Sequence, residues 1–440
     1  MTPPPSADPA ALPADVFSGH RPVGVPTKSF WRKLFAFSGP GYLVAVGYMD
    51  PGNWATGLAG GTGYGYRLLC VILLANFAAM FIQALAAKLG IVTGLDLAQV
   101  CRCAYGRPTA LVLWLLCETA IVACDLAELI GAAIALKLLF GLPLVWGVVV
   151  TGLGVLLLLG LQQRSVRPLE ALIVSLMLVI GLCFAIELAL AQPSLDGILQ
   201  GLVPSRRIID DPAMLYVAIG ILGATIMPHN LYLHSAMVRS RRYDRTASGL
   251  RQAIRFSRID VVAALALAVF VNAAILMLAA STFHGRGLGE VGIEDAYQLL
   301  APALGVGTAS ILFAVALLAA GQNSSITGTL AGQIVMEGFT DLRIAPWIRR
   351  LVSRLLAMVP AMAVIAVCGE EAVTRLLILS QVVLSLQLPF AVWPLVRFTG
   401  DTALMGEFAN GRLTAALAWS LTAVLIGLNV YLVFTASAML

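Results

Sequence analysis

The chain has 440 residues, of which 60% are hydrophobic and only 12% are charged, against roughly 45–50% and about 25% in soluble proteins. A globular core cannot hide so much apolar surface, so the composition argues against a soluble protein and predicts an all-α polytopic membrane protein. The formal charge of +5 comes without a basic arm, which argues against nucleic acid as a partner and leaves the lipid bilayer as the surroundings.

The predicted elements begin with a tail at residues 1–33, rich in Pro, Ala and Ser, which we expect to be disordered. Apolar stretches long enough to cross a bilayer follow it and predict eleven transmembrane helices. They lie at about 35–58, 66–91, 109–140, 143–161, 168–191, 213–238, 258–282, 309–336, 352–368, 373–396 and 412–434.

The positive charges are distributed unevenly between the two sides of this arrangement. Of the 28 Lys and Arg residues, 22 fall on the side of the N-terminus and six on the other. Because positively charged connections stay in the cytoplasm, the N-terminus is predicted inside. An odd number of spans then places the C-terminus outside.

The first and sixth stretches contain helix-breaking sequence in the middle of their apolar runs, DPGN at 50–53 and MPHN at 227–230. Proline removes a backbone donor, and freed carbonyls at membrane depth are tolerated only inside the protein or along a cavity. Five spans separate the breaks, so the second group of five enters the membrane with opposite orientation. We predict an inverted repeat of residues 34–192 and 213–397, with discontinuous first and sixth helices and an additional helix at 412–434.

The two breaks supply a mixed set of donor atoms: the Asp50 carboxylate, the Asn53 side-chain oxygen, the Met227 thioether and free carbonyls such as that of Ala224. Oxygen ligands alone would also accept Ca²⁺ or Mg²⁺, whereas a thioether favours softer ions. The set therefore predicts a transition-metal dication. Structural alternatives are a core-filling Met227 and an Asp50 that only caps a helix, although an acid at bilayer depth is usually functional.

Four segments resemble the signature helices of the NRAMP family of proton-coupled Mn²⁺/Fe²⁺ transporters. They are SGPG at 38–41 with GYMDPGNW at 47–54, MPHNLYLHS at 227–235, GQNSSITGT at 321–329 with GQIVMEGF at 332–339, and SQVVLSLQLPF at 380–390.

This resemblance implies a LeuT-type five-plus-five fold, a monomer, no resident cofactor, and an ion held by Asp50, Asn53, the Ala224 carbonyl and Met227. Gln381 is added by the resemblance alone, with an interhelical hydrogen bond as the alternative. The sequence also departs from the family pattern. Gly57 stands where many members carry Asp, and Asn323 stands where Ser is usual, which bears on local packing and gating.

Three acids, Glu118, Asp125 and Glu128, lie inside the third apolar stretch at spacings that place them on one helical stripe. The resemblance implies that Asp125 and Glu128 pass protons toward the cytoplasm. It also implies that the Asp50 carboxylate couples this proton movement to the metal ion. The alternative is structural pairing with a cation such as Arg354, and both roles can coexist.

Other polar residues have weaker predictions. His229 can relay protons or satisfy freed carbonyls, and His234 is expected to be structural. The arginines at 239, 241, 242 and 245 are predicted to be a topology signal and a lipid-facing patch. The seven cysteines lack zinc spacing and are expected to be small core residues.

The sequence thus predicts a secondary transporter, not an enzyme, that imports Mn²⁺ or Fe²⁺, and also Cd²⁺ or Co²⁺, with protons by alternating access, in a plasma membrane such as the bacterial inner membrane. The main alternative is a carrier of an amino acid or Mg²⁺ with the same architecture, although an organic carboxylate favours a break without an acid. A passive metal channel is a further alternative to a proton-coupled carrier. An intramembrane metalloprotease is disfavoured because His-Glu-x-x-His is missing among the four His residues.

Overall fold

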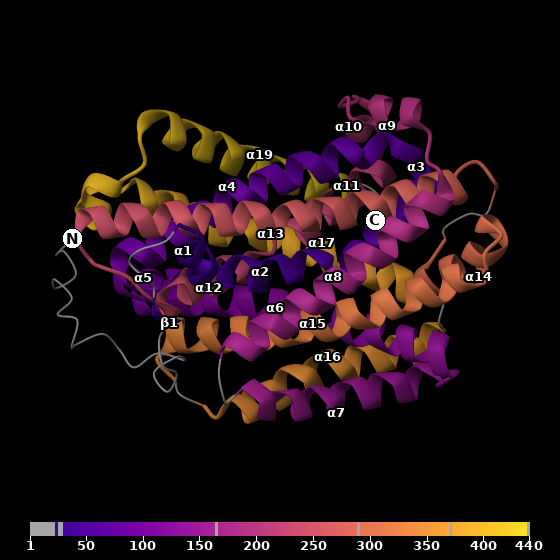
Figure 1. Cartoon of the computed structure of the whole chain (residues 1–440), viewed down its shortest axis with the longest axis horizontal. Coiled ribbons are helices and arrows are strands. Elements are labelled where there is room, and N and C mark those ends of the chain that lie inside the picture. The colour runs from indigo at the N-terminus through magenta and orange to yellow at the C-terminus, as the bar shows by residue number, and fades with distance from the viewer. Residues whose placement is uncertain are drawn as a thin grey trace.

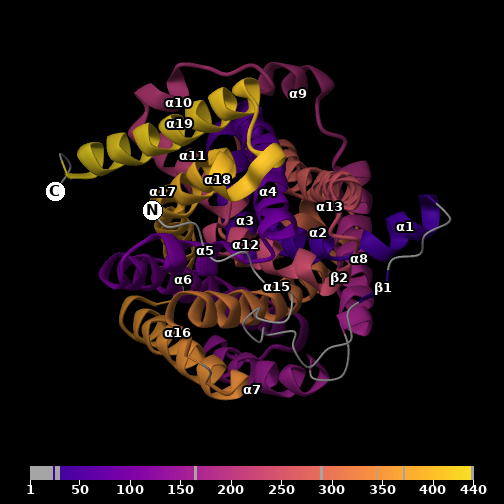
Figure 2. The same ribbon diagram turned by 90° about the vertical axis from the view of Figure 1, so that its left-hand side faces the viewer.

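The structure is a computed structural model that describes residues 23–24, 30–162, 166–287, 291–342, 344–369 and 372–437. The long helices lie side by side along one direction, as Figure 1 shows. Figure 2 looks along this direction and shows α7 (Leu144–Gln162) and α16 (Pro346–Cys368) packed together at one edge of the bundle, with α19 (Arg412–Ser437) at the opposite edge.

The first predicted repeat begins with a broken helix. The α-helix α2 (Pro40–Ala45) and the 3-10 turn η1 (Val46–Met49) end at Asp50, and α3 (Pro51–Tyr64) begins directly after it. The remaining elements of this half are α1 (Phe30–Phe37), η2 (Gly65–Leu68), α4 (Leu69–Thr93), α5 (Leu97–Ala104), α6 (Arg107–Phe140), α7 (Leu144–Gln162) and α8 (Val166–Ala191).

The second predicted repeat begins with another broken helix, in which α11 (Pro212–Thr225) and α12 (Pro228–Met237) are separated around Met227. The other elements around and after it are α9 (Leu195–Gly201), α10 (Arg207–Asp210), η3 (Val238–Ser240), α13 (Ala247–Thr282), α14 (Ile293–Leu304), α15 (Thr308–Thr340), α16 (Pro346–Cys368), α17 (Ala372–Gly400), α18 (Thr402–Met405), η4 (Gly406–Phe408) and α19 (Arg412–Ser437).

The two breaks have the same local construction. Asp50 (φ −66°, ψ 164°) and Met227 (φ −65°, ψ 120°) are both extended N-cap residues, and each is followed by proline at the first helical position. Proline is tolerated there because that backbone N–H would have no helical partner in any case. The same sequence device therefore starts the second half-helix in both halves of the chain.

Among the described residues, nine helical stretches are long and apolar enough to cross a membrane. One of them, Pro51–Thr93, joins the second half of the first predicted span to the second span. The fourth predicted span corresponds to α7, where the apolar helix found is the shorter stretch Leu144–Gly154. A polytopic all-α fold is confirmed, and the count of eleven stays a prediction.

The connections separate in space as the predicted topology requires. The helix α5, predicted inside, lies at one end of the bundle in Figure 1, and α9, α10 and α14, predicted outside, lie at the other. The predicted tail is not entirely irregular: β1 (Val23–Gly24) pairs in parallel with β2 (Arg241–Arg242), and α1 begins at Phe30. The rest of that tail lies outside the described residues.

The broken helix α3 is anchored in the middle of the bundle by Trp54, which is fully buried. Its ring packs edge-on against Phe184 of α8 and Phe313 of α15, with centroids 4.8 Å and 5.0 Å away. Buried aromatic pairs of this kind add about 0.5–1.5 kcal/mol each beyond their area burial. This packing fixes the start of α3, and with it the orientation of Asp50 and Asn53.

Candidate functional site

The break between η1 and α3 holds a fully buried carboxylate. Asp50 Oδ1 accepts a hydrogen bond from the Asn53 backbone N–H at 2.9 Å, which caps the new helix. Its other oxygen, Oδ2, is turned toward the thiol of Cys124 on α6, 3.9 Å away. Asp50 is therefore a helix cap through one oxygen while the second faces the neighbouring helices.

The break between α11 and α12 lies against the first one. A Cβ placed on Gly47 of η1 would overlap the Asn230 amide and stand 3.1 Å from the Met227 sulfur, so the missing side chain at residue 47 lets the two breaks approach closely. Met227 is fully buried and packs with Cys124. The carbonyl of Ala224 lacks its helical partner, because the residue four positions later is Pro228, which carries no N–H.

Two amide oxygens near the breaks have no hydrogen-bond partner. Asn53 is 5% exposed and its Oδ1 makes no hydrogen bond, and the same holds for Oε1 of the fully buried Gln381. The Gln381 side chain lies against Gly52, because a Cβ there would overlap its amide. An unsatisfied buried acceptor costs about 1–3 kcal/mol, so these oxygens are suited to a positively charged ligand.

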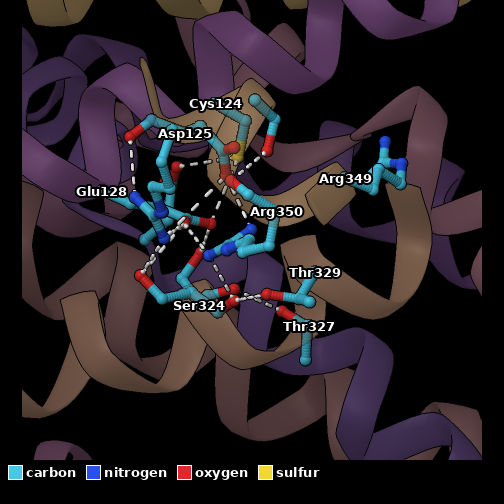
Figure 3. Close-up of polar contacts among 12 residues, drawn as sticks. Cys124, Asp125, Glu128, Ser324, Thr327, Thr329, Arg349 and Arg350 are labelled. Carbon is cyan, nitrogen blue, oxygen red and sulfur yellow. Dashed lines mark hydrogen bonds and ion pairs between the residues drawn. The ribbon is translucent and has the colours of Figure 1, made fainter. Parts of the chain in front are cut away.

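Beside the metal candidates lies a set of buried charges that we call the acid–arginine cluster: Asp125 and Glu128 of α6 with Arg350 and Arg354 of α16. The closest pairs are Arg350 Nη1 with Asp125 Oδ1 at 3.2 Å and Arg354 Nη2 with Glu128 Oε2 at 3.0 Å. Figure 3 shows Asp125, Glu128 and Arg350 turned toward one another. All four side chains are buried, and their formal charges cancel when both acids are ionised.

The helix α15 completes the cluster through two serines of the GQNSSITGT segment. Ser324 Oγ donates to Glu128 Oε1 at 2.7 Å, and Ser325 Oγ donates to Glu128 Oε2 at 3.1 Å. The Arg350 guanidinium also donates to the Ser325 carbonyl at 2.7 Å. Small side chains at these positions let α15 approach α6 closely enough for hydroxyls to reach the carboxylate.

Glu118, the third predicted acid, is not part of the cluster. It lies seven residues before Asp125 on α6 and pairs with Arg349, whose Nη2 is 2.9 Å and 3.0 Å from its two carboxylate oxygens. It is partly exposed, whereas Asp125 and Glu128 are fully buried. The charged stripe of α6 therefore runs from the fully buried acid–arginine cluster to the partly exposed Glu118–Arg349 pair nearer the start of the helix.

The two histidines of α12 differ in their surroundings. His234 Nδ1 lies 3.0 Å from the Gln83 side-chain oxygen, and the Gln83 amide donates to the Tyr48 hydroxyl at 2.9 Å. His229 is 2% exposed and its Nδ1 has no hydrogen-bond partner. The structure thus gives His234 a structural contact between α12, α4 and the first broken helix, which His229 lacks through its Nδ1. Each histidine keeps one buried ring nitrogen without a hydrogen-bond partner, Nε2 in His234 and Nδ1 in His229.

The predicted lipid-facing patch of arginines is wrong for two of its members. Arg241 is 3% exposed, and its guanidinium lies 2.6 Å from Glu170 of α8. Arg239 lies 3.5 Å from Asp96, the capping residue of α5. A charge-assisted hydrogen bond to a carboxylate stabilises a guanidinium strongly, so these two side chains point into the protein toward acids and not toward the lipid.

The sequence profile of the Natural resistance-associated macrophage protein-like (Nramp) family matches residues 41–435. The chain belongs to the Nramp family. The predicted family is therefore confirmed, and with it the prediction that the protein is a transporter rather than an enzyme.

Individual Nramp relatives extend this result. The chain is 56% identical to the divalent metal cation transporter MntH of Xanthomonas campestris over 426 residues, which cover 96% of each protein. A solved mutant of the manganese transporter of Eremococcus coleocola superposes with a TM-score of 0.87 at 43% identity, covering 94% of this chain and 90% of the other.

A more distant solved structure bears on the fold alone. The nucleobase-cation-symport transporter Mhp1 superposes with a TM-score of 0.60 at 16% identity, covering 90% and 89% of the two chains. With the Nramp structure above, it confirms the predicted LeuT-type fold class.

The two departures from the family pattern have local explanations. A Cβ on Gly57 would stand 2.8 Å from a methyl group of Ile275 on α13, so an Asp there would displace the Ile275 side chain from its packing between α3 and α13. Asn323 donates from its amide to the Ile173 carbonyl of α8 at 3.3 Å, a longer reach than a serine has. Both departures act on helix packing and lie away from the proposed ligands.

Sequence reasoning missed three participants. From the sequence, Arg350 is only one of the 22 positive charges on the side of the N-terminus, Ser324 is part of the GQNSSITGT segment, and Cys124 is one of the seven cysteines expected in the core. The signal for Cys124 was its helical position, one residue before Asp125 and four before Glu128. In the part of the chain that the structure describes, no group of three or more His, Cys, Asp or Glu side chains could hold a metal, so a metal here would need the amide, thioether and carbonyl donors.

Proposed function

We propose that the chain imports divalent transition-metal ions, Mn²⁺ or Fe²⁺ and also Cd²⁺ or Co²⁺, together with protons. The ion is bound by Asp50, Asn53, the Ala224 carbonyl and Met227, with Gln381 joining in some conformations. The observation that carries the proposal is the meeting of two unwound helices, where a buried carboxylate oxygen, two unsatisfied amide oxygens and a thioether lie close together.

The chemistry of these donors favours a metal over an organic substrate. A buried anion with unsatisfied oxygens is stabilised by a dication, whereas the carboxylate of an amino acid would be repelled by Asp50. The Met227 sulfur favours Mn²⁺, Fe²⁺, Co²⁺ or Cd²⁺ over Ca²⁺ and Mg²⁺. The names of the relatives support this choice, since one is called a divalent metal cation transporter and another a manganese transporter.

Protons are proposed to leave through α6. Metal binding favours the ionised form of Asp50 and so expels any proton it holds. Glu128 is close, because the Cys124 thiol lies within 3.9 Å of Asp50 and 3.7 Å of Glu128. From Glu128 and Asp125 the charged stripe continues to Glu118.

Two further residues complete the proposed proton pathway. Arg354 lies 3.0 Å from Glu128 and stabilises the carboxylate of Glu128 after its proton has left. His229, two residues after the sulfur ligand and with an unsatisfied ring nitrogen, is the proposed relay on the side of the second break.

The two breaks support a mechanism of alternating access, because a half-helix next to an already unwound backbone can pivot without losing further hydrogen bonds. We propose that the protein works as a monomer, without a resident cofactor, in a bacterial inner membrane with the N-terminus in the cytoplasm and the C-terminus outside.

Uptake into proteoliposomes tests this function. Purified protein should accumulate Mn²⁺ more strongly with an inward proton gradient than without one, and Asp50→Ala should abolish uptake of every metal. A channel would instead pass Mn²⁺ at a rate indifferent to the proton gradient and would never concentrate it. Uptake of Mg²⁺ or an amino acid in place of Mn²⁺ would contradict the proposed substrate.

A further inference from the structure

Cys124 occupies a position that its residue type alone did not predict. It is 2% exposed on α6 and packs with Met227 in one small apolar group. Its sulfur nevertheless lies 3.9 Å from Asp50 Oδ2 and 3.7 Å from Glu128 Oε1. Close to the buried thiol are therefore a carboxylate and a thioether, and the unsatisfied Asn53 Oδ1 belongs to the first turn of α3, the helix that this carboxylate caps.

The separation of the Cys124 sulfur and the Asp50 oxygen suits a shared ion. A sulfur at about 2.3 Å and an oxygen at about 2.1 Å from a tetrahedral metal lie about 3.6 Å apart, and the distance grows for ions larger than zinc. The observed 3.9 Å differs from this by a few tenths of an ångström, within the reach of a change in the Cys124 rotamer.

Resting on the proposed function, we propose that Cys124 is an additional sulfur ligand that shifts the ion preference of this site toward soft dications. With Met227 it gives the site two sulfur donors beside the oxygens of Asp50 and Asn53. Two sulfurs favour Cd²⁺ over Mn²⁺ more strongly than one, because Mn²⁺ gains little from replacing an oxygen ligand by sulfur. Coordination takes the sulfur as thiolate, so the metal–sulfur bond forms as the S–H bond breaks and the proton passes to Glu128 Oε1, 3.7 Å from the sulfur.

The chain offers a matched control in Cys117. It is fully buried on α6, seven residues before Cys124, which places it about 10 Å away along the helix. Substituting either cysteine removes the same thiol from the same buried helix. Only Cys124 lies beside Asp50.

The test measures Cd²⁺ and Mn²⁺ affinity of the full chain by isothermal titration calorimetry. Cys124→Ala should weaken Cd²⁺ binding by about tenfold or more while leaving Mn²⁺ binding within about threefold, and Cys117→Ala should change neither. An unchanged Cd²⁺/Mn²⁺ ratio in Cys124→Ala would overturn the inference and leave the proposed function standing. Failure of the unsubstituted protein to bind either ion would overturn both.

A second measurement does not depend on the alanine variant folding. X-ray absorption at the cadmium edge should give two sulfur neighbours in the Cd²⁺-loaded protein and one in Cys124→Ser, which retains nearly the native side-chain size. A single sulfur in the unsubstituted protein would refute Cys124 as a ligand.

Discussion

Replacing Asp125 by asparagine is the sharpest perturbation of the proposed proton pathway. The substitution keeps the size of the side chain and removes one of the two negative charges that face Arg350 and Arg354. Asp125 Oδ1 lies 3.2 Å from Arg350 and 4.0 Å from Arg354. Arg354 keeps Glu128 at 3.0 Å, so Arg350 loses its closest acid and the acid–arginine cluster acquires a net positive charge.

The distances set the size of the effect on stability. Unit charges 3.2 Å apart attract by about 5 kcal/mol at an effective dielectric of about 20, and removing one partner of a buried pair costs about 3–5 kcal/mol. Glu128 stays 3.9 Å from Arg350 and partly replaces the lost acid. We therefore expect Asp125→Asn to lower the free energy of unfolding by about 3 kcal/mol, the low end of this range. A protein with ordinary stability remains folded after such a loss.

The effect on transport should be selective. Asp125 is not one of the proposed ligands, so Mn²⁺ affinity should stay within about threefold of the unsubstituted protein. Each coupled proton adds about 1.36 kcal/mol per unit of pH gradient to the driving force for metal uptake, and this energy raises the metal accumulation ratio about tenfold. The variant should lose that tenfold gain and show a flattened pH dependence of uptake, while Mn²⁺ still enters at some rate.

Proteoliposomes with a trapped pH indicator and a metal-sensitive dye measure both fluxes in one experiment, and Glu128→Gln serves as a second variant expected to act in the same direction. Unaltered proton influx in Asp125→Asn would refute the role of α6 as a separate proton path. So would a loss of Mn²⁺ binding as complete as in Asp50→Ala, and the acids would then have only their structural role.

Further predictions concern selectivity, packing and topology. Met227→Ala should weaken Cd²⁺ binding by about 1–3 kcal/mol, and should let Ca²⁺ compete for uptake where the native protein excludes it, as competition assays would show. In Gly131→Ala, the new methyl group would overlap the Pro51 ring at the first break and should cost about 1–3 kcal/mol, seen as a lower thermal unfolding temperature. Gly154→Ala, which meets no atom within 4 Å, is its control and should not be destabilised. A reporter fused to the C-terminus should lie outside the cytoplasm, and a cytoplasmic signal would remove the odd span count.

Much of the fold could be predicted because bilayers impose simple constraints. A proline in the middle of an apolar run must break the helix, and the structure breaks both helices at Asp50 and Met227. The spacing of those breaks by five spans predicted that they belong to two related halves. The structure brings them together, with Gly47 of the first break close to the Met227 sulfur of the second.

The partners of individual charges could not be predicted in the same way. Which arginine of α16 meets Asp125 depends on the axial offset between α6 and α16, which no pattern within either helix encodes. Arg354 was a named candidate, yet Arg350 is the closer partner of Asp125. The inward turn of Arg241 likewise depends on Glu170, which lies 71 residues away in the sequence.

The central claim is that one divalent metal ion is held between the two helix breaks, and anomalous diffraction from crystals grown with Mn²⁺ tests it most directly. The account predicts one strong manganese peak about 2.0–2.6 Å from an Asp50 carboxylate oxygen and in contact with the Asn53 and Met227 side chains. A peak at the acid–arginine cluster, or elsewhere in the protein with none beside Asp50, would contradict the account.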